Sequence, residues 1–251
     1  MDVVPLQSVF AVDSSLAFIF FIAFSLMTVL GVRFALYAYW NLGATDLDSQ
    51  AVLWEYLLFV GLAAALYGLL GVVESVTAVT PSMTVVETPY RDGVFLAFLL
   101  MLALTMREIY DNDALTNAGI DSGGAFEQRR TIEMSFAVIV TGSVFGTGIF
   151  GTHIVLTAVE GVAALVFASY GLVYGQRQLS RSSVQGTMID SLLRHLLPVV
   201  AFGLLVLAID LTILFGLNVG IVRHIQVVFV IMTATTLMTA TIKLRQNVAG
   251  L

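Results

Sequence analysis

The chain has 251 residues, of which 59% are hydrophobic and 11% are charged, and its mean hydropathy is +0.96. A soluble domain carries about 25% charged residues, so this composition indicates an integral membrane protein. The chain contains no cysteine, which excludes disulfides, thiolate metal sites, iron–sulfur clusters and a cysteine nucleophile. The net charge of −6 argues against a nucleic-acid partner.

The charged residues are biased in kind as well as in number. There are 17 acidic residues against 11 basic ones, and Lys243 is the only lysine. An acidic excess with almost no lysine is typical of proteins from salt-loving archaea, in which surface carboxylates maintain solubility. GC-rich codon usage is the alternative explanation. Residues 1–15 have no positively charged segment before an apolar run, so we expect no cleaved secretory signal.

Seven apolar runs follow one another along the chain, at about residues 15–40, 51–79, 90–110, 131–150, 153–174, 189–217 and 221–245. Each is long enough to cross a bilayer, which needs about 20 residues. The strict alternation of a membrane β-barrel is not visible, so these runs predict unbroken helices. The fold class predicted is therefore all-α, a single seven-transmembrane-helix domain over residues 1–251. Residues 111–130 are rich in Asn, Asp and Gly and predict a mobile loop.

The orientation is predicted from the basic residues near the helix ends, because cytoplasmic loops are enriched in them. With the N-terminus outside and the C-terminus inside, only Arg91 and Arg223 fall outside. The inner set is Arg33, Arg107, Arg129, Arg130, Arg177, Arg181, Arg194, Lys243 and Arg245. We therefore expect a multi-pass protein of the plasma membrane with a cytoplasmic C-terminus.

Glycines at helical spacing predict the close helix contacts. Gly142 and Gly146 form one GxxxG pair, and Gly171 and Gly175 form another. The second apolar run carries Gly61, Gly68 and Gly71. Small residues let helix backbones approach closely within lipid. We expect packing within one chain, and a homo-oligomer interface on the same glycines is the alternative.

Ionisable residues within the spans are costly and mark candidate functional positions. Those predicted for the outer half are Glu74, Arg91, Asp92, His153, Glu160, Asp210, Arg223 and His224. One interpretation is an external vestibule for a ligand or an ion pathway, involving Glu74, Asp92, Glu160, Asp210, Arg91, Arg223 and His224. The other is a set of structural ion pairs and groups that reach water at the interface.

The inner half holds fewer such groups, namely Glu55, Glu133 and Asp190, each near a helix start where an acid complements the helix dipole. No paired-histidine metal spacing, phosphate-binding loop, GxSxG or HExxH motif occurs. We therefore predict no catalytic residues, no metal and no cofactor.

The helix count, the orientation, the length and some local sequence together resemble the microbial (type I) rhodopsins. Residues 90–95, Tyr-Arg-Asp-Gly-Val-Phe, followed by a leucine-rich stretch, resemble that family's third helix. The resemblance implies that Asp92 occupies the position of the Schiff-base counterion. Leu193-Arg194, which opens the sixth run, resembles the family's arginine at that place, and residues 225–237 resemble the start of its seventh helix.

The chain departs from that family at the chromophore. The positions of the family's seventh-helix aspartate and retinal-binding lysine fall on Thr233 and Leu237, and the tryptophan after the aspartate falls on Gly93. The aromatic positions of the sixth helix fall on Ala201 and residues 204–205. Lys243 lies six residues beyond Leu237, about 9 Å along a helix. A retinal Schiff base needs a lysine in the pocket, so we expect none to form.

Three functions are consistent with these features. The first is a rhodopsin-like, non-enzymatic sensory, signalling or assembly subunit that contacts a separate protein through its cytoplasmic loops. The second is a small transporter or ion pathway that uses Glu160 and Asp210. The third is a membrane-embedded enzyme acting on a lipid or carotenoid. Unbroken helices weigh against the second function, and the lack of clustered catalytic residue types weighs against the third.

Overall fold

A computed structural model describes residues 14–44, 48–80, 86, 88–118, 123–151, 153–180 and 188–250. Its helices are α2 (Ser14–Gly43), α3 (Asp48–Val79), α4 (Arg91–Ala118), α5 (Gly123–Phe150), α6 (Ile154–Leu179), α7 (Met188–Ala208), α8 (Leu211–Leu214) and α9 (Val219–Gly250). The described residues contain no strand, and seven segments are long and apolar enough to cross a membrane. The predicted all-α, seven-span fold is confirmed, and the chain is a multi-pass membrane protein.

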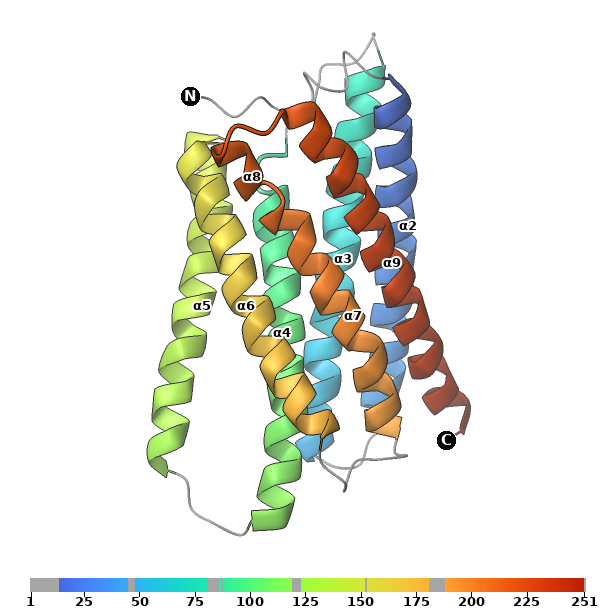
Figure 1. Cartoon of the computed structure of the whole chain (residues 1–251). Coiled ribbons are helices and arrows are strands. Elements are labelled where there is room, and N and C mark those ends of the chain that lie inside the picture. Colours follow the sequence, from blue (N-terminus) through green and yellow to red (C-terminus); the bar gives the residue numbers. More distant parts are fainter. Residues whose placement is uncertain are drawn as a thin grey trace.

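The helices alternate in direction around α4, which contacts α3, α5, α6 and α7 (Figure 1). In the most apolar window of each span, 67% of the residues of α4 are buried but only 22% of those of α5. The helix α5 therefore lies at the periphery, and it diverges from α4 toward one end of the bundle (Figure 1). We name the two ends after arginines of α4. The "Arg91 end" holds the starts of α4, α6 and α9, and the "Arg107 end" holds their ends.

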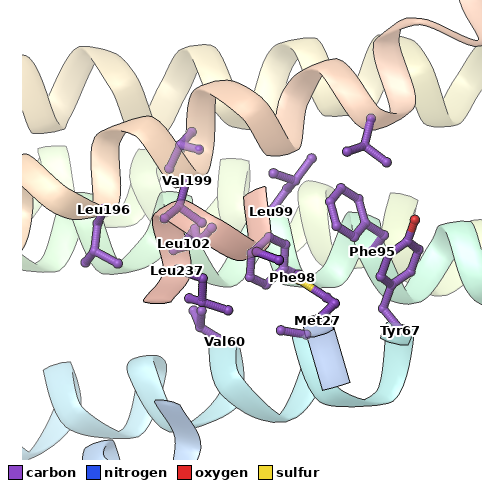
Figure 2. Close-up of a cluster of buried hydrophobic side chains, with 14 of the residues drawn as sticks. Met27, Val60, Tyr67, Phe95, Phe98, Leu99, Leu102, Leu196, Val199 and Leu237 are labelled. Carbon is purple, nitrogen blue, oxygen red and sulfur yellow. The ribbon is translucent and has the colours of Figure 1, made fainter. Parts of the chain in front are cut away.

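The middle of the bundle is a packed apolar layer. Figure 2 shows Met27, Val60, Tyr67, Phe95, Phe98, Leu99, Leu102, Leu196, Val199 and Leu237 side by side, each at most 1% exposed. Every helix except α5, α6 and the short α8 contributes to this labelled group. Buried threonines at this depth, such as Thr105 and Thr233, donate to carbonyls of their own helices at 2.8 Å. The layer therefore separates the polar groups of the Arg91 end from those of the Arg107 end.

Two expectations about the helices are wrong. Residues 111–118 continue α4 and residues 123–130 belong to α5, so most of the expected loop is helical. The ion pair between Arg107 and Asp111, one turn apart on α4 at 3.5 Å, helps the helix to continue beyond the apolar segment. The sixth apolar run is also interrupted, because α7 ends at Ala208 and α8 begins at Leu211.

The glycines divide into two groups. A Cβ atom on Gly61 would lie 2.5 Å from the backbone nitrogen of Ala35, so α2 and α3 pack backbone to backbone there. A Cβ atom on Gly171 would similarly lie 2.9 Å from Ala103 of α4. A Cβ atom on Gly142 would meet nothing within 4 Å. The prediction of close packing is therefore confirmed for Gly61 and Gly171 and is wrong for Gly142.

Candidate functional site: a buried charge network at the Arg91 end

The start of α4 inserts Arg91 between α3 and α2. Its Nη1 atom donates to Oε2 of Glu74 at 2.6 Å, and its Nε and Nη2 atoms each lie 3.3 Å from Oδ1 of Asp92. The guanidinium carbon lies 5.3 Å from the ring centre of Phe24 and 5.9 Å from that of Tyr67, in reach of cation–π attraction. The side chains of Arg91 and Glu74 are 6% and 8% exposed, so this ion pair is withdrawn from water.

Thr88 completes the first cluster from the segment that precedes α4. Its hydroxyl donates to the same Glu74 oxygen at 2.9 Å, and its carbonyl accepts from the backbone N–H of Arg91 at 3.0 Å. The turn that starts α4 therefore also holds the carboxylate at the end of α3. A buried charge needs both a counter-charge and further hydrogen bonds, and Glu74 receives both.

The second cluster forms where the sixth span is interrupted. The N–H of Asp210 donates to Leu207 three residues back at 3.2 Å, rather than to Val206 four residues back. The freed carbonyl of Val206 accepts instead from the side-chain Nε2 of Gln226 on α9 at 2.9 Å. A neighbouring helix thus satisfies the broken turn, as it must within lipid.

Arg223 of α9 binds the buried carboxylate of Asp210, which lies at this break. Its Nη1 atom lies 3.1 Å from Oδ1 of Asp210 and 2.6 Å from Oε1 of Gln226. Gln226 also donates to Oδ2 of Asp210 at 3.2 Å. The side chains of Arg223 and Asp210 are 6% and 4% exposed. The second cluster is therefore a buried triad of an acid, a base and an amide that joins α7, α8 and α9.

Glu160 of α6 differs from the other buried acids. It is 5% exposed and accepts a short hydrogen bond from the hydroxyl of Ser143 on α5. Within the part of the chain that the structure describes, it forms no ion pair. It interacts electrostatically with Asp92, Asp210 and Arg91, so it belongs to the same charge network. Glu160 is thus the buried carboxyl group of this network that has no arginine of its own.

Six of the seven predicted site residues meet in this network, which contains Glu74, Arg91, Asp92, Glu160, Asp210 and Arg223. The seventh, His224, lies on the exposed side of α9, with its Nδ1 2.7 Å from the carbonyl of Gly220. His153 also lies apart, because it caps α6 and accepts from the N–H of Val155 at 3.3 Å. If all six residues were ionised, the four acids and two arginines would carry a net charge of −2.

Three neutral members of the network were not predicted from the sequence, namely Thr88, Ser143 and Gln226. Gln226 lies three residues after Arg223, so it occupies the same face of α9, and this spacing was a usable signal. Ser143 gave no such signal, since a hydroxyl in an apolar helix commonly bonds to its own backbone. Among the described residues, no three His, Cys, Asp or Glu side chains lie together as metal ligands would.

The other end of α4 carries a more open cluster. Arg107 forms ion pairs with Glu108 at 2.9 Å, with Asp111 at 3.5 Å and with Glu133 of α5. These four side chains are 12–20% exposed, compared with 6–8% for Arg91 and Glu74. Asp190 lies in the first turn of α7 and pairs with Arg194 one turn later at 2.9 Å, while Glu55 is exposed on α3.

The structure also gives the locations of the residues on which the comparison with microbial rhodopsins depends. Leu237 and Thr233 of α9 are fully buried in the apolar core. The Nζ atom of Lys243 donates to Oε1 of Gln246 at 3.2 Å on the exposed side of α9, near the Arg107 end. Comparison of the chain with protein-family models, with curated proteins and with solved structures gave no significant match. The resemblance to microbial rhodopsins therefore stays a prediction.

Proposed function

We propose that the chain is a non-enzymatic, rhodopsin-like membrane sensor that takes up a proton at Glu160. In this proposal the Arg91 end faces the outside of the plasma membrane, and the Arg107 end contacts a separate signalling protein. The observation that carries the proposal is the environment of Glu160, a buried carboxyl group that is bonded to a serine and close to two other acids. Burying an unpaired charge is costly, and a bound proton removes that cost.

Proton uptake at Glu160 would change the forces between helices. The added proton forms an O–H bond and removes one negative charge beside Asp92 of α4 and Asp210 at the α7–α8 break. The repulsion between α6 and these neighbours then falls. The hydrogen bond to Ser143 of α5 also changes, because a protonated carboxyl group can donate as well as accept. Since α5 is the least buried of the spans, we expect it to move at the lowest cost.

The apolar layer favours a sensor over a transporter. Below the network, Phe95, Phe98 and Leu99 are each 0% exposed, and Figure 2 shows them in contact with side chains of other helices. A proton or ion crossing the membrane needs a chain of polar groups or water. The helix break at Asp210 is a feature that transporters use, but it lies at the Arg91 end and not within this layer.

The test is a distance measurement across the Arg107 end as the pH changes. The chain has no cysteine, so Met134→Cys on α5 and Val52→Cys on α3, both at exposed positions, give two unique spin-label sites. In lipid nanodiscs, pulsed electron paramagnetic resonance should show a change in the inter-label distance between pH 4 and pH 9. We expect Glu160→Gln to hold one distance over the whole range.

The matched control is Glu55→Gln, which removes an exposed acid of α3 at the other end of the bundle. This variant should keep the pH response. The proposal would be overturned if the inter-label distance in the parent protein did not change with pH. It would also be overturned if the distance still changed with pH in a folded Glu160→Gln variant. Proton flux in sealed vesicles that is lost in Glu160→Gln would instead support the transporter.

A further inference from the structure

A groove of about 330 Å³ lies on the membrane face of the bundle, between α2 and α9. Its walls are mostly apolar and include Leu30, Met238 and Ile242, and Arg33, Arg245 and Gln246 also line it. The two arginines come from different helices and lie at the same groove. The groove therefore presents an apolar surface and a positive charge together, in the half of the bundle nearer the Arg107 end.

These two arginines differ from the four arginines that are paired within the bundle, and they differ from the exposed Arg177, in the last turn of α6, in that they line the groove. Arg91, Arg107, Arg194 and Arg223 each have a carboxylate within 3.5 Å. Arg33 and Arg245 are exposed and form no ion pair or side-chain hydrogen bond within the described part of the chain. Arg33 lies ten residues before the end of α2 at Gly43, about 15 Å along the helix. A guanidinium at this depth, flanked by the exposed Val32 and Leu36, is costly without a counter-charge, and an anion from outside the chain would supply one.

The groove is also held in shape by contacts between its two helices. The side chain of Asn41 on α2 donates to the carbonyl of Leu244 on α9 at 3.3 Å, and Asn247 donates back to Asn41. Tyr37, which lines the groove, packs edge to face on Trp40 with ring centres 5.3 Å apart. Trp40 is 49% exposed, and exposed aromatic residues of this kind mark the level of the lipid headgroups.

We infer that this groove binds an anionic phospholipid, with Arg33 and Arg245 on its phosphate and one acyl chain along Leu30, Met238 and Ile242. The planar guanidinium groups suit the oxygens of a phosphate, which they bind in a bidentate manner. Basic pockets between transmembrane helices bind lipid headgroups by this combination of charge and apolar wall. The site is separate from the buried network and does not depend on the proposed sensing function.

The chain provides its own reporter for this lipid. It has two tryptophans, Trp40 beside the groove and the buried Trp54, so Trp54→Phe leaves one fluorophore at the site. The purified Trp54→Phe protein is titrated in mixed micelles with brominated phosphatidylglycerol or with brominated phosphatidylcholine, because bromine atoms quench a nearby indole. We expect half-quenching at a concentration about tenfold or more lower for phosphatidylglycerol, given the gain for each basic residue near an anionic lipid.

Two variants decide the outcome. Arg33→Gln/Arg245→Gln should bring the two lipids to equal potency, whereas Arg177→Gln, which removes another exposed arginine at the Arg107 end, should keep the preference. If the double variant does not fold, Arg33→Lys/Arg245→Lys keeps the charge without the planar fork and should lose part of the preference. Equal quenching in the parent protein, or an undiminished preference in the double variant, would overturn the inference. Inorganic phosphate should not displace the lipid, and displacement by it would identify a phosphate-ion site in place of a lipid site.

Discussion

Each end of α4 has an arginine that is paired with carboxylates, but the two arginines differ in their surroundings. Arg91 and Arg107 lie 16 residues apart, about 24 Å along the helix, and each holds more than one carboxylate. Around Arg91 the ion pair with Glu74 is 6–8% exposed, and the second partner, Asp92, is 21% exposed. Around Arg107 the arginine is 12% exposed and its three partners are 16–20% exposed. The Arg91–Glu74 pair is therefore sealed by protein, whereas every ion pair of Arg107 is partly exposed.

This difference in exposure affects how strongly each charged side chain depends on its partners. At the Arg107 end, every member of the ion pairs is partly exposed, so the loss of one member is expected to cost less. At the Arg91 end, the Arg91–Glu74 and Arg223–Asp210 pairs are 4–8% exposed, so each of these charges depends on its partner. Glu160 interacts with acids of other helices at the sealed end, and this is the reason for proposing it as the group that takes up a proton.

The largest effect is expected for Arg91→Gln. This substitution leaves Glu74 buried without a counter-charge, and the free energy of unfolding should fall by about 3–5 kcal/mol. The measurement is equilibrium unfolding in bicelles by a denaturing detergent. The control is Arg194→Gln, whose side chain is 55% exposed and should cost less than about 1 kcal/mol. Equal losses in the two variants would remove the distinction between the sealed and open ends.

A smaller loss is expected for Asp210→Asn in the second buried cluster. Arg223 then keeps Gln226 as an acceptor but loses its ionised partner, and we expect a loss of about 2–3 kcal/mol. The double variant Asp210→Asn/Arg223→Gln removes both charges and should regain about 1 kcal/mol or more relative to the sum of the single losses. Strictly additive losses in the same unfolding assay would mean that the two residues do not interact.

At the Arg107 end, Arg107→Gln should cost only about 1 kcal/mol, because the carboxylates that it leaves behind are partly exposed. Its effect should also decline in 1 M salt, which shortens the screening length to about 3 Å. The loss from Arg91→Gln should change much less with salt. A salt-independent loss at Arg107 would show that this cluster is sealed as well.

No effect is expected from added retinal. Leu237 lies in the packed core where the family places its lysine, and Lys243 contacts Gln246 on the exposed side of α9. The purified protein incubated with all-trans retinal should show no visible absorption band that survives washing. A stable band that disappears in Lys243→Ala would contradict this prediction and restore a photoreceptor function.

The sequence predicted the membrane spans well and the helix ends less well. The second and fourth runs, at residues 51–79 and 131–150, coincide with the spans Ala51–Val79 and Thr131–Phe150. Hydropathy detects only the part of a helix that lies in lipid, so it missed the extensions of α4 to Ala118 and of α5 back to Gly123. It also missed the break before Asp210, because every residue from 199 to 209 is apolar and the side chain that satisfies the freed carbonyl, Gln226, lies on another helix.

The candidate site was predicted as a set of residues but not as an arrangement. Charged residues are rare in apolar runs, so Glu160 and Asp210 were easily found. Their partners were not, because pairing depends on how helices are placed around α4. The Glu74–Arg91 pair joins residues 17 apart on two helices, and Glu160 depends on a neutral serine from the preceding helix.

The break in the sixth span has a consequence for how the protein is assembled in the membrane. The Val206 carbonyl has lost its acceptor role within its own helix and accepts instead from Gln226, which is synthesised 20 residues later. Until that residue arrives, the sixth span would carry an unsatisfied carbonyl into lipid, which is unfavourable. The last two spans are therefore expected to leave the insertion machinery as one helical hairpin, and a chain truncated before Gln226 should be retained there or degraded.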